Sequence, residues 1–289
     1  MIVSDKGGYP APAKLNLFLH VVGRRPDGYH LLQSVFRFID YGDTLYFEVR
    51  ADGEIRRVNA VAGLDDPDKD LCVRAARLLQ QATGCGLGVD IRLEKRLPMG
   101  GGLGGGSSDA ATVLLALNRL WRLDLGRERL QQMGLQLGAD VPVFVFGRSA
   151  FAEGVGELLQ PVDLPRAWYV VLVPPVAVPT AEIFASRELT RDTIPIKIAD
   201  FSKGQWHKEL GQRRNDLEPV VCRNYPQVAE YLAWLKQFGA ARMTGSGACV
   251  FAGFETQGEA ERVFLQKPAH MEGFMAQGLD RHPLWELVE

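Results

Sequence analysis

Residues 98–109 read PMGGGLGGGSSD, and six of the seven residues in 100–106 are glycine. A cluster of this kind marks backbone that bends sharply or approaches another group closely. Before it, residues 89–94 alternate apolar and charged side chains, which is the period of a half-buried strand. After it, apolar residues recur at helical spacing over 113–121, and the polar residues 107–109 suit the start of a helix. The pattern predicts a strand, a glycine loop and a helix.

A glycine loop that leads into a helix presents free backbone N–H groups, which together form a cradle for phosphate oxygens. The alternative interpretation is a flexible hinge. The stretch also satisfies G-x-G-x-x-G at Gly100, Gly102 and Gly105, but in so glycine-rich a segment that match is weak. It lacks the lysine of a Walker-type loop, which excludes that class of nucleotide site. A nicotinamide site needs an acidic residue about 20 positions later, after a second strand, and Asp124 follows a helix instead.

The N-terminal segment predicts a β-hairpin. Residues 13–20 alternate in polarity, so the side chains of Lys14 and Asn16 project from the same face of a strand. Residues 25–28, Arg-Pro-Asp-Gly, have the composition of a tight turn. The turn delivers Tyr29 and His30 into the next strand.

The remaining elements alternate irregularly along the chain. Strands and helices that mix without a regular βαβ rhythm favour the α+β class. In the first half we expect helices at 70–81 and 126–137, a left-handed cap at Gly138, and a strand at 141–146. In the second half we expect strands near Phe151 and at 169–173 and 249–254, a strand and glycine turn at 241–248, and helices at 226–238 and 258–265.

The length and composition limit the possible classes of protein. With 289 residues the chain is long enough for two domains, which we place at 1–157 and 158–289, with the extreme C-terminus packing on the first. A formal net charge of -2 does not favour a nucleic-acid partner. The sequence contains neither an apolar run of about 20 residues nor a secretory signal, so we expect no membrane partner and a cytoplasmic location. No obligate protein partner is indicated.

The cysteines and histidines show no metal-binding pattern. The four cysteines form no C-x-x-C pair, and the five histidines lack the spacing of metal ligands. We therefore expect buried thiols in a reducing compartment, and no metal ion that protein side chains alone hold.

Residues 98–108 resemble the phosphate-binding motif of the GHMP small-molecule kinases. Two further segments resemble the first and third motifs of that family, in the same order: 12–17, PAKLNL, and 243–251, MTGSGACVF. The resemblance extends over essentially the whole chain. It implies a two-domain α+β fold with the active site in the cleft between the domains, ATP as co-substrate with Mg²⁺, and a small-molecule acceptor.

Further segments resemble the branch of this family that phosphorylates a cytidine diphosphate derivative of methylerythritol. They are 12–20, 25–30, 40–43 and 137–144. A kinase for another small alcohol, such as a sugar or a mevalonate-like acid, is the near alternative. A non-catalytic binding protein of the same fold would be expected to lack Lys14 or Asp140, and both are present.

By itself Asp140 is a polar residue at a turn, which is common at such junctions. The resemblance makes it the catalytic base that takes the proton from the substrate hydroxyl, a step that suits a buried carboxylate near a cation. Lys14 is expected beside it, where the ammonium holds Asp140 ionised and stabilises the charge of the transferring phosphoryl group.

The resemblance also assigns the two binding ends of the site. Substrate-binding residues are Asn16, Tyr29, His30, Thr180 and Phe184, with the aromatic rings stacking on the cytosine and His30 bonding its edge. ATP-binding residues are Lys95, Pro98, Met99, Gly100, Gly101, Gly102, Leu103, Gly104, Gly105, Gly106, Ser107 and Ser108.

Three assignments at the ATP end need separate comment. Lys95 is expected to contact the base of ATP, although a solvated lysine at a strand end is an equal alternative. Ser108 is a candidate Mg²⁺ ligand, and that ion prefers phosphates and water. Asp70 stands where the family more often has Asn, and a carboxylate cannot supply the donor of an amide.

Overall fold

The computed structural model describes residues 7–64, 66–198 and 210–288, and ten strands in this part of the chain form one sheet. The strand order is β3-β4-β2-β10-β7-β9-β8, with β1 and β5 also pairing with β2, and β6 with β5. All pairs are antiparallel except β3 with β4. The strands are β1 (Tyr9–Arg24), β2 (His30–Arg50), β3 (Ile55–Arg57), β4 (Gly88–Glu94), β5 (Ala150–Glu153), β6 (Leu158–Pro161), β7 (Trp168–Val173), β8 (Arg242–Met243), β9 (Val250–Phe254) and β10 (Glu272–Leu279).

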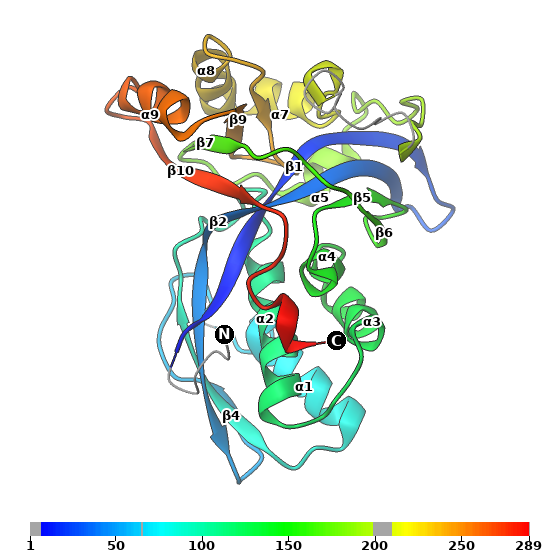
Figure 1. Cartoon of the computed structure of the whole chain (residues 1–289). Coiled ribbons are helices and arrows are strands. Elements are labelled where there is room, and N and C mark those ends of the chain that lie inside the picture. Colours follow the sequence, from blue (N-terminus) through cyan, green and yellow to red (C-terminus); the bar gives the residue numbers. More distant parts are fainter. Residues whose placement is uncertain (1–6, 65, 199–209, 289) are drawn as a thin grey trace.

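The long strands β1 and β2 run through both halves of the molecule and hold the two halves together (Figure 1). The predicted turn between them is confirmed, because the N–H of Gly28 donates to the carbonyl of Arg25 at 3.0 Å. Gly28 has a φ of +93°, a conformation that a glycine adopts without steric cost. The register of the pair shifts between Asn16 and Leu19.

Four helices cover one face of the half that contains β3 and β4 (Figure 1): α1 (Leu71–Thr83), α2 (Gly105–Leu120), α3 (Arg127–Leu137) and α4 (Val141–Phe146). Helix α2 is the central one, and all its residues from Ser108 to Asn118 are buried. Its buried hydroxyls donate to β1, Ser108 to the carbonyl of Pro12 at 2.7 Å and Thr112 to that of Pro10 at 3.3 Å. The helix that follows the glycine loop is therefore fixed directly to the first strand.

The structure corrects three expectations about this half. Residues 141–146 form helix α4 and not a strand, since an apolar run this short fits either element and Pro142 suits the first turn of a helix. Gly138 has a φ of 172°, so it is extended, and the left-handed cap is Gly147 at the end of α4. Helix α2 begins at Gly105, ahead of the polar residues that we expected to start it.

The other half carries helices α5 (Thr180–Ala185), α7 (Glu218–Asn224), α8 (Pro226–Leu235) and α9 (Gln257–Leu265). Strand β10 pairs with β7 and then with β2, so it leads the chain back to the first half. Beyond it, Leu284 and Val288 lie in the same apolar core as α2, on either side of a short 3-10 helix, Trp285–Leu287. The α+β class is confirmed.

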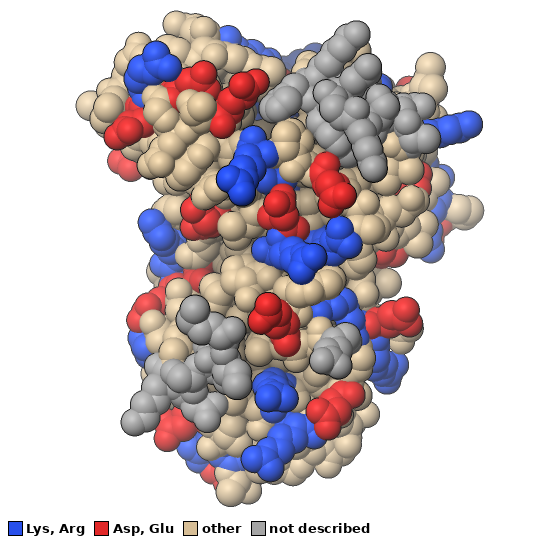
Figure 2. Space-filling view, in the orientation of Figure 1, with Lys and Arg blue, Asp and Glu red and all other residues tan. Residues whose placement is uncertain are grey.

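Figure 2 shows basic and acidic side chains interspersed on one face, without an extended region of either sign. No helix within the described ranges is both long and apolar enough to span a bilayer. The four cysteines are free thiols. Residues 1–6, which belong to the segment in which we sought a signal sequence, lie outside the described residues.

Candidate active site

A cavity of about 990 Å³ lies where the glycine loop, the β1–β2 hairpin, α5 and the turn at 245–247 meet. Every residue that we expected in the site lines this cavity except Ser108. The hydroxyl of Ser108 is fully buried and donates to Pro12, as described above. The structure therefore brings together residues that lie up to 170 positions apart in the sequence, such as Lys14 and Phe184.

The glycine loop has a conformation that only glycine adopts readily. Every second residue, Gly100, Gly102 and Gly104, has a positive φ of 69°, 74° and 74°. Alternation of this kind turns successive backbone N–H groups toward one side and makes a concave site for anions. At its end the first N–H groups of α2 have no partner within the helix, and the N-cap Gly104 has no side chain to satisfy them.

The loop is held on its other side, so it is not a flexible hinge. Four consecutive carbonyl groups accept hydrogen bonds from the framework of the protein. The bonds run from Ala248 N to Gly100 O at 3.2 Å, Cys249 N to Gly101 O at 3.1 Å, Lys14 Nζ to Gly102 O at 3.0 Å, and Lys14 N to Leu103 O at 2.9 Å. The N–H groups are thus held in place before any ligand arrives.

Lys14 and Asp140 lie side by side, as the resemblance implies. The Nζ atom of Lys14 is 3.3 Å from Oδ2 of Asp140, 2.6 Å from Oδ1 of Asn16 and 3.0 Å from the carbonyl of Gly102. The Lys14 side chain is 3% exposed, whereas that of Asp140 is 38% exposed. Asp140 is therefore less buried than we expected, and its carboxylate is the part of the pair that a ligand in the cavity can reach.

A chain of buried polar groups fixes Lys14. Asn16 accepts from the ammonium and donates from Nδ2 to Oγ of Ser34 at 2.8 Å. Ser34 in turn donates to the carbonyl of Phe18 at 2.6 Å. Thr244 accepts from the N–H of Asn16 at 2.9 Å, which joins the third motif to the first. Sequence reasoning missed Ser34, which nothing distinguishes from other strand residues.

Lys95 is an interior ion-pair residue and not a solvated one. Its Nζ donates to Asp43 at 2.6 Å and to Asp109 at 2.7 Å. Burial raises the pKa of Asp109 to about 7, although the charge of Lys95 opposes this effect. Burial by itself would lower the pKa of Lys95, but the charges of Asp109 and Asp43 raise it above its ordinary value. Sequence reasoning missed both carboxylates, although Asp43 lies in one of the segments that carry the resemblance.

Asp70 has a structural role that the sequence did not reveal. Its Oδ1 accepts from the N–H of Cys72 at 2.9 Å and caps helix α1. Its Oδ2 accepts from Nε of Arg57 at 2.5 Å. Arg57 also donates to the carbonyls of Asn59 and Leu64, so it holds the 59–64 loop at the edge of the cavity.

The opposite end of the cavity carries the expected aromatic groups. The rings of His30 and Phe184 stack with centroids 5.0 Å apart and an interplanar angle of 30°. Tyr29 is 64% exposed and lines the cavity beside them. Thr180 is 2.6 Å from Ser246, hydroxyl to hydroxyl, so α5 contacts the turn of the third motif. Burial and the charges of Arg191 and Arg24 lower the pKa of His30.

Metal-ligating side chains do not cluster in the described part of the chain. No group of three or more His, Cys, Asp or Glu side chains there is arranged to hold a metal ion. Ser108, the expected Mg²⁺ ligand, is fully buried and does not line the cavity, so a ligand there does not reach its hydroxyl.

Comparisons with known proteins match both halves of the chain to one family. The profile of the GHMP kinases N terminal domain matches residues 70–148, and that of the GHMP kinases C terminal domain matches 200–272. A 4-diphosphocytidyl-2-C-methyl-D-erythritol kinase of Thiobacillus denitrificans is 66% identical over 280 residues, covering 97% of this chain and 98% of that protein.

Solved structures are similar over almost the whole chain. A crystal structure of 4-(cytidine 5'-diphospho)-2C-methyl-D-erythritol kinase has a TM-score of 0.80 at 35% identity, covering 94% of this chain and 98% of that one. A mevalonate kinase has a TM-score of 0.66 at 15% identity, covering 95% and 99%, which shows a shared fold alone. With both family domains and a relative of such identity over its full length, this chain belongs to the GHMP kinase family.

Proposed function

We propose that this chain transfers the γ-phosphoryl group of ATP to the 2-hydroxyl of 4-diphosphocytidyl-2-C-methyl-D-erythritol, giving the 2-phosphate and ADP in non-mevalonate isoprenoid precursor synthesis. The observation that carries the proposal is the pair of Lys14 and Asp140, 3.3 Å apart, beside a glycine cradle. The aromatic pair of His30 and Phe184 lines the same cavity. The choice of substrate is supported by relatives that match almost the whole chain and are named as kinases of this compound.

Asp140 is the proposed proton acceptor. The acceptor hydroxyl gives its proton to the carboxylate as its oxygen bonds to the γ-phosphorus, and the bond from that phosphorus to the β,γ-bridging oxygen breaks. Lys14 offsets negative charge on the phosphoryl oxygens. Phosphoryl transfer depends mainly on position and electrostatics, so a base, a cation and a phosphate cradle suffice.

The proposed ATP site is the cradle with its preorganised N–H groups, and the space beside Lys95 takes the base. Asp70 takes no part in recognising adenine in this proposal, because both its oxygens are already bonded. Mg²⁺ is expected to accompany ATP, held by phosphate oxygens and water. No step above is assigned to the ion.

We propose a cytoplasmic enzyme without a nucleic-acid, membrane or obligate protein partner. We propose a division at 1–157 and 158–289 with the cavity between the two parts, the phosphate loop in the first part and Thr180 and Phe184 in the second.

The test is phosphorylation of three acceptors in parallel. The purified chain is given ATP, Mg²⁺ and either the cytidine diphosphate substrate, galactose or mevalonate, and ADP release is followed. Phosphorus NMR then locates the new phosphate. Turnover of the cytidine compound alone, with phosphate on the 2-oxygen, supports the proposal. Preference for galactose or mevalonate would replace the proposed substrate with another small alcohol.

A further inference from the structure

Arg191 connects the two aromatic residues at the pyrimidine end of the cavity. Its Nε donates to Nε2 of His30 at 3.0 Å. Its Nη2 donates to the carbonyl of Phe184 at 3.0 Å and to that of Ser186 at 2.6 Å, and its Nη1 to that of Leu189 at 3.1 Å. A single guanidinium thus fixes the loop after α5 and contacts the imidazole whose ring stacks on Phe184.

The contact with His30 has a chemical consequence. A guanidinium donates and never accepts, so Nε2 of His30 must present its lone pair to Arg191. A neutral imidazole carries one proton, which therefore resides on Nδ1. Within the described residues no other hydrogen bond to the imidazole of His30 is present, so Nδ1–H is the side-chain donor that remains for a ligand.

We propose that Arg191 is a positioning residue that fixes His30 in the Nδ1–H form and so makes the site select cytosine over uracil. The inference rests on the proposed function, since it takes the ligand to be a cytidine derivative. Cytosine presents an acceptor at N3, whereas uracil presents an N–H there. An Nδ1–H donor bonds to N3 of cytosine, whereas at N3 of uracil it faces another donor. A site with one fixed donor rejects an analogue that leaves this donor unpaired.

The charges around the ring favour the same state. Burial lowers the pKa of His30, and the positive charges of Arg191 and Arg24 lower it further. His30 consequently remains neutral near pH 7. Without Arg191, the ring is free to exchange its proton between the two nitrogens, and it then meets either pyrimidine with a suitable atom.

The first measurement is the tautomer itself, which requires no turnover. Nitrogen-15 NMR of the imidazole distinguishes a protonated from an unprotonated ring nitrogen, and a His30→Gln variant identifies the signals. In the parent protein we expect a proton on Nδ1 and a lone pair on Nε2. Arg191→Met should yield a mixture of both forms, while Arg191→Lys, which retains a donor and a charge, should keep most of the Nδ1–H form.

The second measurement compares kcat/KM for the cytidine substrate and its uridine analogue. Arg191→Met should reduce the preference for cytidine at least tenfold, through KM and with little change in kcat, because these contacts lie away from the reacting hydroxyl. Arg191→Lys should retain most of the preference for the cytidine substrate. Arg187→Met is the matched control, since Arg187 is an exposed arginine of the same loop and makes no contact with His30.

Three outcomes would overturn the inference. One is a parent protein with the proton on Nε2. Another is an Arg191→Met variant that keeps both the tautomer and the preference. The third is an equal loss of kcat/KM with both substrates in Arg191→Met while the imidazole keeps its Nδ1–H form, which would mean that Arg191 only holds the loop. Failure of the parent to phosphorylate the cytidine substrate would instead refute the proposed function, and the NMR result would stand apart from it.

Discussion

At the scale of single residues, Lys14 connects the glycine loop with the carboxylate of Asp140. Its ammonium bonds to the glycine loop through Gly102 and contacts Asp140 at the same time. Asn16 supplies the third contact, so a carbonyl, an amide oxygen and a carboxylate surround the ammonium. A cation held in this way requires little reorganisation when charge develops nearby, which is the condition for electrostatic catalysis.

The role of Asp140 is tested by Asp140→Asn. The amide is nearly the same size but cannot take a proton, so kcat should fall by about 10²–10⁴-fold. Binding of ATP, followed by titration calorimetry, should change little, because the cradle does not include this side chain. Near-normal turnover by a well-folded Asp140→Asn protein would exclude it as the base.

Gly104 tests whether the loop also fixes Lys14. A Cβ atom at Gly104, which has a φ of +74°, would lie 3.1 Å from Cε of Lys14 and 3.0 Å from the ring of Phe144. Gly104→Ala should therefore lower kcat as well as raise the KM for ATP. Gly106→Ala is the matched control, because its Cβ would meet only Leu71 at an ordinary 3.4 Å. Equal losses in both variants would show that the strain at Gly104 does not reach Lys14.

At the scale of elements, the sequence predicted those segments whose pattern has one interpretation. The alternation in β1 placed Lys14 and Asn16 on one face, and their hydrogen bond confirms it. The strand predicted at 141–146 was wrong, because an apolar segment this short shows no periodicity that separates a strand from a helix. Its packing against the neighbouring helices then decides which of the two it forms. Lys95 with its two carboxylates was not predictable, because such pairs depend on how distant elements pack.

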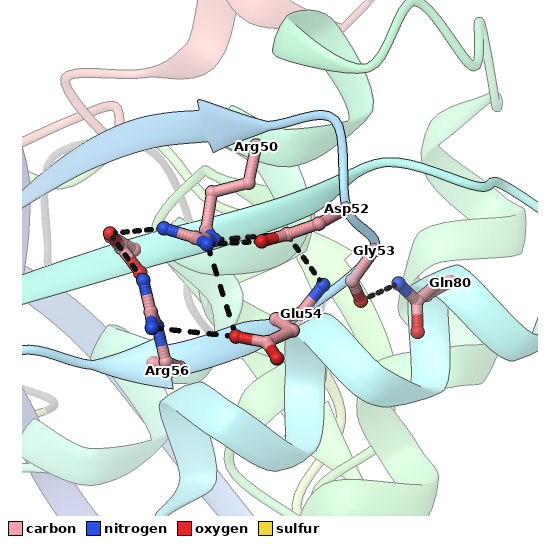
Figure 3. A network of polar contacts seen from close by, with 7 residues as sticks. Arg50, Asp52, Gly53, Glu54, Arg56 and Gln80 are labelled. Carbon is pink, nitrogen blue, oxygen red and sulfur yellow. Dashed lines mark hydrogen bonds and ion pairs between the residues drawn. The ribbon is translucent and has the colours of Figure 1, made fainter.

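Two neighbouring arginines on β3 have different surroundings. Arg56 is 48% exposed and belongs to a network with Arg50, Asp52 and Glu54 at the β2–β3 turn, which Figure 3 shows together with the bond from Gln80 to the carbonyl of Gly53. Arg50 and Arg56 also both pair with Asp90 on β4, so Asp90 keeps one partner when the other is removed. Arg57 is 11% exposed and pairs with Asp70, which is 1% exposed. Exposed pairs contribute little to stability, whereas removing one member of a buried pair costs about 3–5 kcal/mol.

Arg57→Met should therefore lower the free energy of unfolding by about 3–5 kcal/mol, because it leaves the carboxylate of Asp70 buried and unpaired. It should also raise the KM for ATP, since the 59–64 loop loses two bonds at the edge of the cavity. Arg56→Met, the adjacent control, should change neither quantity appreciably. Denaturant unfolding and ATP titration measure both, and similar effects from the two variants would contradict this assignment.

At the scale of the whole molecule, the last described residues, 284–288, pack on the half that carries the glycine loop. Arg127 on α3 donates to the carbonyl of Trp285 at 2.8 Å, and its guanidinium lies 4.0 Å from that ring. His282 is buried, with Nδ1 accepting from the N–H of Leu284 at 3.0 Å. Burial, together with the charge of Arg127, lowers the pKa of His282 to about 3.

This shift predicts how stability depends on pH. An unfolded chain binds a proton at His282 as the pH falls below about 6.5, whereas the folded protein does not until about pH 3. The unfolded state therefore binds more protons in that window, and the free energy of unfolding decreases as the pH falls, with a contribution of at most about 1.4 kcal/mol per pH unit. His282→Asn keeps an acceptor for Leu284 but cannot titrate, so its stability should fall less steeply between pH 6.5 and 4. Leu284→Ala, which removes packing from the same segment without removing a titrating group, should lower stability by about 2–5 kcal/mol at every pH and keep the parent slope. Urea unfolding at a series of pH values gives the free energy of unfolding of all three proteins. If it falls as steeply with pH in His282→Asn as in the parent, other groups govern the acid sensitivity.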